Sequence, residues 1–197
     1  MGLTIHYSGI FDKDASLTAF IGEVKDIAMT FNWPHKIFEE TFPSRAFDDR
    51  YDDKIYGACF TPPDCETVWL SFLSNRRLSS PSNLTFYGKS DDDDEKKYLY
   101  MLSVKTQFAG VEVHKFVIHL LKYLNQKYFS EFNVHDEGEY WETANEKLLD
   151  ENFKRYTGLL NSFRTALETY PLREGETLES YFERLHKYVN DNFRKSG

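Results

Sequence analysis

The strongest constraint on the fold is a helical run of apolar residues with a strand-like segment on either side of it. Residues 109–128 carry apolar side chains at the spacing of one buried helix face: Val113, Phe116, Val117, Leu120, Leu121, Leu124 and Tyr128, with Ile118 widening the stripe. The flanking segments 98–105 and 131–136 have the length and composition of β-strands. If both strands lie in one sheet they are parallel, and the crossover between them is right-handed.

The other segments predict an α+β fold. We expect strands at 3–8, 36–42, 54–60, 67–73 and 83–88, a helix at about 16–31, and two C-terminal helices that begin near 143 and 177. A hairpin is expected around Pro62 and Pro63, and a solvated turn at the acidic run 90–97. This order predicts a mixed, mostly antiparallel sheet with one strand-helix-strand crossover. We expect residues 1–197 to form a single α+β domain in which an antiparallel helix pair, about 143–194, packs on the sheet.

The charge of the chain argues against two classes of partner. Its formal net charge is −8, whereas binding to nucleic acid or to an anionic membrane depends on clustered Lys and Arg. No stretch approaches the roughly 18 consecutive apolar residues of a membrane span, and the N-terminus has no secretory pattern. Two cysteines, Cys59 and Cys65, are too few for a disulfide scaffold and lack zinc or redox spacing. We expect a cytoplasmic protein with reduced cysteines that binds neither nucleic acid nor membrane.

Polar and aromatic side chains follow both strands of the predicted crossover. Parallel strands end at the same sheet edge, where ligands of open α/β sheets bind, so the two loops are expected to face each other. The candidate ligand-binding residues at this edge are Lys105, Thr106, Gln107, Asp136, Glu137, Glu139, Tyr140 and Trp141, with His114 near the start of the intervening helix.

Two interpretations of the second loop, residues 135–143, stay open. As a site, Asp136 and Glu137 can ligate a cation or act as acid and base, while Tyr140 and Trp141 form a stacking wall. As a helix start, the acidic residues suit the positive end of a helix, and the aromatic pair suits a half-buried joint. The pattern favours the second interpretation.

No motif identifies a reaction. The chain lacks GxxxxGK[ST], GxGxxG, GxSxG and HExxH. His114 and His119 are five residues apart, whereas a helical metal pair needs a spacing of three or four. We predict no cofactor and no metal site.

The stretches "KTQFAGVEVHKFVIHLLKYL" and "VHDEGEYWET" resemble a group of uncharacterised bacterial proteins that pair a TQ-F/Y-A helix start with a DEG-x-YWET turn. The likeness covers roughly residues 100–160. It implies a bacterial intracellular protein and supports treating the two loops as one unit. Since that group has no known activity, the resemblance assigns no catalytic role.

The sequence favours a non-catalytic protein that binds a protein or small-molecule partner at this edge. The alternative is a hydrolase that uses Asp136 and Glu137 with His114 or a bound cation. A third interpretation is a structural subunit of a homo-oligomer, such as a homodimer, that pairs through the apolar stripes of the C-terminal helices.

Overall fold

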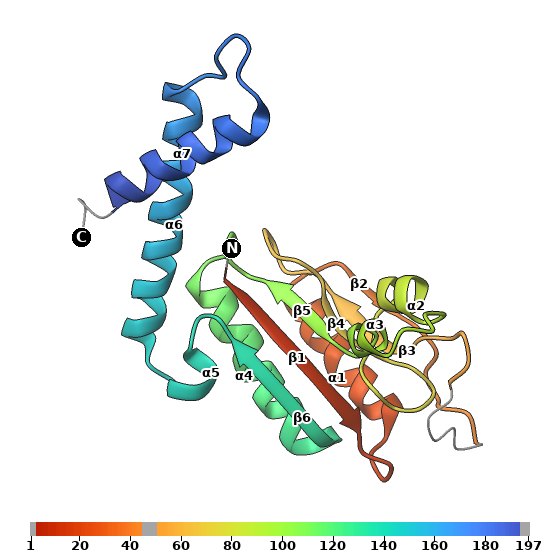
Figure 1. Cartoon of the computed structure of the whole chain (residues 1–197). Coiled ribbons are helices and arrows are strands. Elements are labelled where there is room, and N and C mark those ends of the chain that lie inside the picture. The colour runs from red at the N-terminus through yellow and green to blue at the C-terminus, as the bar shows by residue number, and fades with distance from the viewer. Residues whose placement is uncertain (1–2, 45–50, 194–197) are drawn as a thin grey trace. The chain divides into compact units, whose positions relative to one another are not determined.

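A computed structural model describes residues 3–44 and 51–193 of the chain, which have an α+β fold (Figure 1). The chain divides into two compact units, Met1–Glu146 and Lys147–Gly197. Both sheets lie in the first unit, and most of the last two helices lies in the second. A single domain with the helix pair packed on the sheet stays a prediction.

The N-terminal strand forms the centre of the first sheet. β1 (Thr4–Phe11) pairs antiparallel with β5 (Leu102–Lys105) on one side and with β6 (Phe129–Asp136) on the other. β5 and β6 therefore run parallel to each other, and α4 (Val111–Tyr128) connects them. The predicted strand-helix-strand unit is confirmed. Its two strands are separated by β1, so this sheet is antiparallel between every pair of neighbours.

The remaining strands form a second antiparallel sheet, so the predicted single mixed sheet is wrong in this respect. Its order is β2 (His35–Ile37), β3 (Tyr56–Phe60) and β4 (Val68–Phe72). The hairpin between β3 and β4 turns at the predicted proline pair. α1 (Leu17–Thr30) packs on β3. At its start the hydroxyl of Ser16 accepts a hydrogen bond from the N–H of Ala19, as expected for an N-cap.

Isolated β-bridges, Ile10 to Arg77 and Phe72 to Leu78, connect the two sheets, and further hydrogen bonds join them where their edge strands β4 and β5 approach each other. The Tyr7 hydroxyl, from β1, donates to the Trp69 carbonyl at 2.9 Å and accepts from the Trp69 N–H at 3.0 Å. The Glu66 N–H donates to the Lys105 carbonyl at 3.3 Å, and the Glu66 carboxylate accepts from the Lys105 N–H at 2.9 Å. These bonds occupy backbone groups of Trp69 and Lys105 that direct pairing of β4 with β5 would use.

Two short helices replace elements predicted between β4 and β5. Residues 83–88, predicted as a strand, lie largely in α2 (Pro81–Tyr87), where the Ser80 hydroxyl accepts from the Asn83 N–H and Pro81 stands in the first turn. The acidic run, predicted as a turn, contains α3 (Asp93–Tyr98), whose start is capped by Asp92. Its acidic first turn and basic last turn both suit the helix dipole.

Aromatic rings fill the centre of the first unit. The ring of Phe11 meets the edges of Phe20 and Phe72 at centroid distances of 5.4 and 5.0 Å and stacks on Tyr128 at 6.0 Å. These four residues come from β1, α1, β4 and α4. Such edge and offset contacts add to the free energy gained from burial, so this cluster holds the two sheets and two helices together.

The last two helices pack against each other in the second unit. α5 (Tyr140–Thr143) is followed by α6 (Glu146–Thr169) and α7 (Leu178–Phe193). Ala166 of α6 and Tyr181 and Leu185 of α7 form a small core. None of the helices in the described part of the chain has the length and apolar content of a membrane span.

Candidate functional site

The structure brings together three of the predicted site residues at the shared end of β5 and β6. The Thr106 hydroxyl lies 2.7 Å from Nδ1 of His114, and Nε2 of His114 lies 3.2 Å from Oδ2 of Asp136. Thr106 follows β5, His114 lies in the first turns of α4, and Asp136 ends β6. The convergence expected from the parallel orientation of β5 and β6 is therefore observed for these side chains.

Asp136 fixes the start of the helix that follows it. Its Oδ1 accepts the N–H of Gly138 at 2.8 Å, and its Oδ2 accepts the N–H groups of Tyr140 at 2.8 Å and Trp141 at 3.0 Å. Burial alone would raise the pKa of Asp136, but the hydrogen bonds from His114 and from these amides hold that pKa below its ordinary value. The carboxylate is thus kept ionised by the backbone that it caps.

Most of the other candidates do not converge with this group. The Glu137 carboxylate accepts the Thr4 N–H at 2.9 Å, which extends the pairing of β6 with β1. Tyr140 is buried beside the ring of His119, and Trp141 lies under Lys122. Lys105 is half-buried with its ammonium over the ring of Phe108, and Glu139 is exposed in the turn.

The burial of these groups decides their role. The side chains of His114 and Asp136 are both fully enclosed, so a substrate cannot reach them without local unfolding. Their hydrogen bonds tie the ends of β5 and β6 to the start of α4. This enclosure favours the helix-start interpretation of loop 135–143, which stays a prediction.

Gln107 is the exception among the buried candidates. It is only 7% exposed, and within the described part of the chain neither its Oε1 nor its Nε2 has a hydrogen-bond partner. A buried amide without partners costs free energy. Gln107 thus makes no contribution that a similar apolar side chain could not make.

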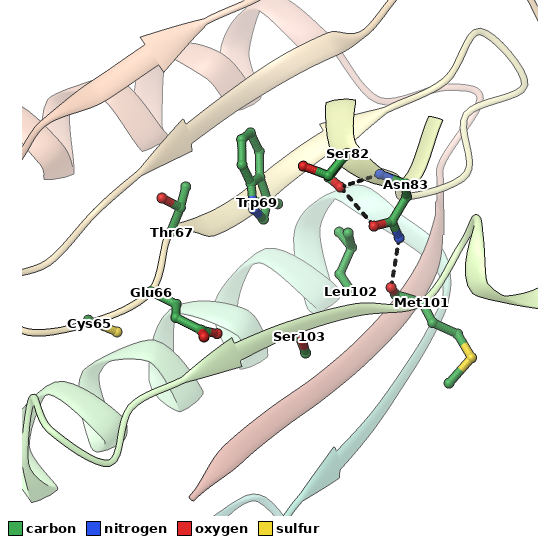
Figure 2. Close-up of a pocket in the computed structure, with 10 residues that line it drawn as sticks. Cys65, Glu66, Thr67, Trp69, Ser82, Asn83, Met101, Leu102 and Ser103 are labelled. Carbon is green, nitrogen blue, oxygen red and sulfur yellow. Dashed lines mark hydrogen bonds between the residues drawn. The ribbon is translucent and has the colours of Figure 1, made fainter. Parts of the chain in front are cut away.

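A pocket lies between the edge strands β4 and β5, beside α2 (Figure 2). Its volume is about 480 Å³. The residues that matter for its chemistry are Glu66, Thr67, Trp69, Asn83, Leu102 and Ser103. It lies where β4 and β5, which belong to different sheets, are not paired directly with each other.

Asn83 shapes one end of the pocket. Its side-chain amide donates to the Tyr98 carbonyl at 2.8 Å and to the Met101 carbonyl at 2.9 Å, and its Oδ1 accepts from the Ser80 hydroxyl at 3.0 Å. Figure 2 shows the bond from Asn83 to Met101 at the start of β5. These bonds attach α2 to β5, so this wall of the pocket is held by several hydrogen bonds.

The charge and the aromatic surface of the pocket come from Glu66 and Trp69. Glu66 is the one charged side chain among the described residues that line it. One Glu66 oxygen accepts the Lys105 N–H, which positions the carboxylate, and the half-buried Trp69 lines the same pocket from β4 (Figure 2). A carboxylate and an indole face both attract cations.

Cys65 borders the same pocket, and its surroundings disfavour the thiolate form. Burial, together with the neighbouring Glu66 carboxylate, raises the pKa of the Cys65 thiol to about 11. The thiol is therefore protonated at neutral pH, and a protonated thiol is unreactive.

Sequence reasoning did not find this pocket because three separated segments form it: residues 65–69, α2 and β5. One signal was present. Trp69 is half-buried in a strand whose other residues are buried, and the polar Thr67 and the acidic Glu66 precede it. Comparison of the chain with models of protein families, with curated proteins and with solved structures gave no match.

Proposed function

We propose that this protein is a non-catalytic binding protein whose ligand occupies the pocket between β4 and β5. The observation that supports this most directly is the pocket itself, about 480 Å³ in volume with Trp69 and Glu66 on its wall. That volume is in the range of small-molecule sites, and a mixed aromatic and polar lining is typical of them. The proposed site is thus adjacent to Lys105 but separate from the buried group around Asp136.

The geometry around Asp136 argues against the alternative, a hydrolase that uses Asp136 and Glu137 with His114. A general acid or base needs access to substrate and a pKa near the working pH. Asp136 is enclosed, accepts three backbone N–H groups and has a lowered pKa. The Glu137 carboxylate accepts a hydrogen bond from the Thr4 N–H. These contacts favour a structural role for both carboxylates.

The distribution of charge supports a basic partner. The first unit, Met1–Glu146, holds 24 acidic and 15 basic residues and so has a formal charge of −9, whereas the second unit has 8 acidic and 9 basic residues and a charge of +1. Such a field favours encounter with positively charged ligands and disfavours nucleic acid and anionic membranes. We propose a cytoplasmic location and, from the resemblance noted above, a bacterial source.

The second unit supports a proposal of self-association. Leu178 and Phe182 lie one turn apart on α7 and are 65% and 51% exposed. Exposed apolar residues of this kind are typical of subunit contacts. A homodimer through this surface predicts a sizing-column elution at twice the chain mass, which Leu178→Glu should return to the monomer position.

A thermal-shift screen tests the proposed pocket. Purified protein is screened against common metabolites, amines and short peptides, and each hit is repeated on Trp69→Ala and on Trp141→Ala, a matched change at the edge predicted from the sequence. A ligand present at a hundred times its dissociation constant stabilises the protein by about 2.7 kcal/mol, which is measurable.

Loss of a hit in Trp69→Ala, with its retention in Trp141→Ala, is the expected result. The reverse pattern would move the site to the edge around Trp141, and hits that survive both changes would contradict the pocket assignment. Glu66→Gln, a change at an exposed side chain, provides a second variant if Trp69→Ala is too unstable to assay.

A further inference from the structure

We propose that the occupant of the pocket is a short extended peptide segment that pairs with the backbone of Ser103 and sets a Lys or Arg side chain against Glu66 and Trp69. This inference rests on the proposed function, since it names the ligand of the same pocket. Three independent observations support it: the direction of the backbone groups of β5, the hydrogen bonds that bound its free edge, and the charge of the pocket.

The pairing of β5 with β1 leaves the backbone N–H and C=O of Ser103 directed away from β1. The Thr106 N–H donates to the carbonyl of Leu3, directly before β1, at 3.0 Å, so by the register of β1 with β5 the residues at even positions of β5 turn their backbone toward β1. Residues at odd positions turn outward, because backbone groups alternate along a strand next to an antiparallel neighbour. Ser103 therefore presents an N–H and a C=O to the pocket that it lines.

The odd positions on either side of Ser103 are already bonded. The Met101 carbonyl accepts from Asn83, and the N–H and C=O of Lys105 are bonded to Glu66. For Ser103 itself, no hydrogen bond from outside the sheet is found among the described residues. The N–H and C=O of Ser103 are thus available to an added strand, between the bonded backbone groups of Met101 and Lys105.

The spacing of these ends limits the length of the segment. Met101 and Lys105 are four residues apart, which at about 3.4 Å per residue is roughly 14 Å of strand. A segment of about three extended residues fits between the Asn83 and Glu66 bridges. Addition of a strand to an exposed sheet edge is a common mode of peptide recognition, in which backbone bonds give affinity and pockets select side chains.

The pocket selects for positive charge. Its charged side chain is the Glu66 carboxylate, Trp69 also lines it, and the first unit as a whole carries an excess of acidic residues. An ammonium or guanidinium group gains from the carboxylate, and an indole is a further group that attracts cations. An acidic side chain in the same place meets repulsion from Glu66.

Pools of blocked tripeptides, the length that fits between the two bridges, test this inference on the full chain. Each pool has one fixed central residue, Lys, Arg, Glu or Leu, and random residues elsewhere, so the result does not depend on one chosen sequence. Binding is followed by amide chemical shifts and hydrogen exchange. The Ser103 amide is compared with that of Val134, which the same alternation turns outward on the opposite sheet edge, β6.

We expect the Lys and Arg pools to bind at least about tenfold more tightly than the Glu pool and to slow exchange of the Ser103 amide while that of Val134 is unchanged. N-methylation of the two backbone amides next to the central Lys should abolish binding, and Glu66→Gln should reduce the preference for Lys over Leu to less than about threefold.

Two results would overturn the inference. Equal binding of all four pools would remove charge selection. The second result is that butylammonium binds in the pocket while no peptide pool binds there and the Ser103 amide stays unprotected. The pocket would then be a small-cation site: the proposed function would stand and the peptide assignment would fail. If neither the pools nor any compound in the thermal-shift screen depends on Trp69, the proposed function itself fails.

Discussion

His114 and Asp136 share a hydrogen bond that is closed to solvent, with Nε2 of the imidazole 3.2 Å from Oδ2 of the carboxylate. With Thr106 on the other side of the ring, the pair links the end of β5, the start of α4 and the end of β6. Residues that resemble catalytic groups in the sequence therefore serve as a joint between three elements. The predictions below follow from this joint, from the bridge between the sheets and from the chemistry of the pocket.

Asp136→Asn should lower the free energy of unfolding by about 3 kcal/mol, because it weakens a buried pair and three amide bonds at once. Glu139→Gln, in the same turn but exposed, should change it by less than about 0.5 kcal/mol. Chemical denaturation of both variants measures the difference. An equal, small effect of the two changes would show that the Asp136 network does not stabilise the fold.

The same carboxylate predicts a dependence of stability on acid. A carboxyl whose pKa is lowered by folding adds stability above its unfolded pKa of about 3.9, and this contribution is lost as the pH falls through the lower folded value. Wild-type protein should thus lose stability below about pH 4 more steeply than Asp136→Asn. Denaturation midpoints measured between pH 3 and pH 7 check this, and parallel curves would contradict it.

Tyr7→Phe should cost about 1 to 3 kcal/mol, because it leaves the N–H and C=O of Trp69 without the hydroxyl that satisfies both. Tyr98→Phe, at a side chain that is 52% exposed, is the control and should be nearly neutral. If the Tyr7 change also shifts Trp69 fluorescence, the hydroxyl positions the pocket wall as well as the sheets. A neutral Tyr7→Phe would indicate that water replaces the bridge without cost.

Gln107→Met should leave the free energy of unfolding unchanged or raise it by up to about 1 kcal/mol, since it removes a buried amide that has no partner and keeps the chain length. Gln126→Met, at an exposed position of α4, controls for the gain in hydrophobicity. Thermal and chemical denaturation provide the measurement. A loss of more than about 1 kcal/mol at Gln107 alone would mean that the amide is hydrogen-bonded in solution.

Cys65 should react with iodoacetamide about a hundredfold more slowly at pH 8 than a thiol with an ordinary pKa, because a pKa of about 11 leaves little thiolate. Mass spectrometry of the folded protein, compared with the chain in denaturant, gives the two rates. Glu66→Gln should speed the reaction, since it removes the negative charge that opposes the thiolate. A folded-state rate equal to the denatured rate would contradict the burial of this thiol.

The sequence was informative where local pattern and chain geometry agree. The apolar stripe of α4 and its flanking strands predicted the convergence of Thr106, His114 and Asp136, because parallel strands must end at one edge. The same reasoning did not tell whether these side chains face solvent or the core, which depends on packing around the edge. The enclosed side chains of His114 and Asp136 favour the structural interpretation of loop 135–143, which stays a prediction.

Other features were outside the reach of periodicity. Residues 83–88 alternate like a strand, yet Ser80 and Pro81 already form a helix start, and capping outweighs a short alternating pattern. The acidic run was predicted as a turn from its charge, yet Asp92 caps a short helix within it. The pocket needed knowledge that Glu66 and Tyr7 bridge two sheets, and such contacts between distant residues leave no periodic signal.

The central place of β1 has a consequence for how the chain reaches its native state. Thr4 is bonded to Glu137, 133 residues further along, and Thr106 to Leu3 across 103 residues. During synthesis β1 is made before its partner strands, so it stays unpaired until β5 and β6 have been added. Contacts of such sequence separation slow folding, and an unpaired apolar strand is prone to aggregation in the interval. This topology predicts refolding in milliseconds to seconds. It also predicts that the first sheet becomes resistant to protease only once the chain has been made through β6.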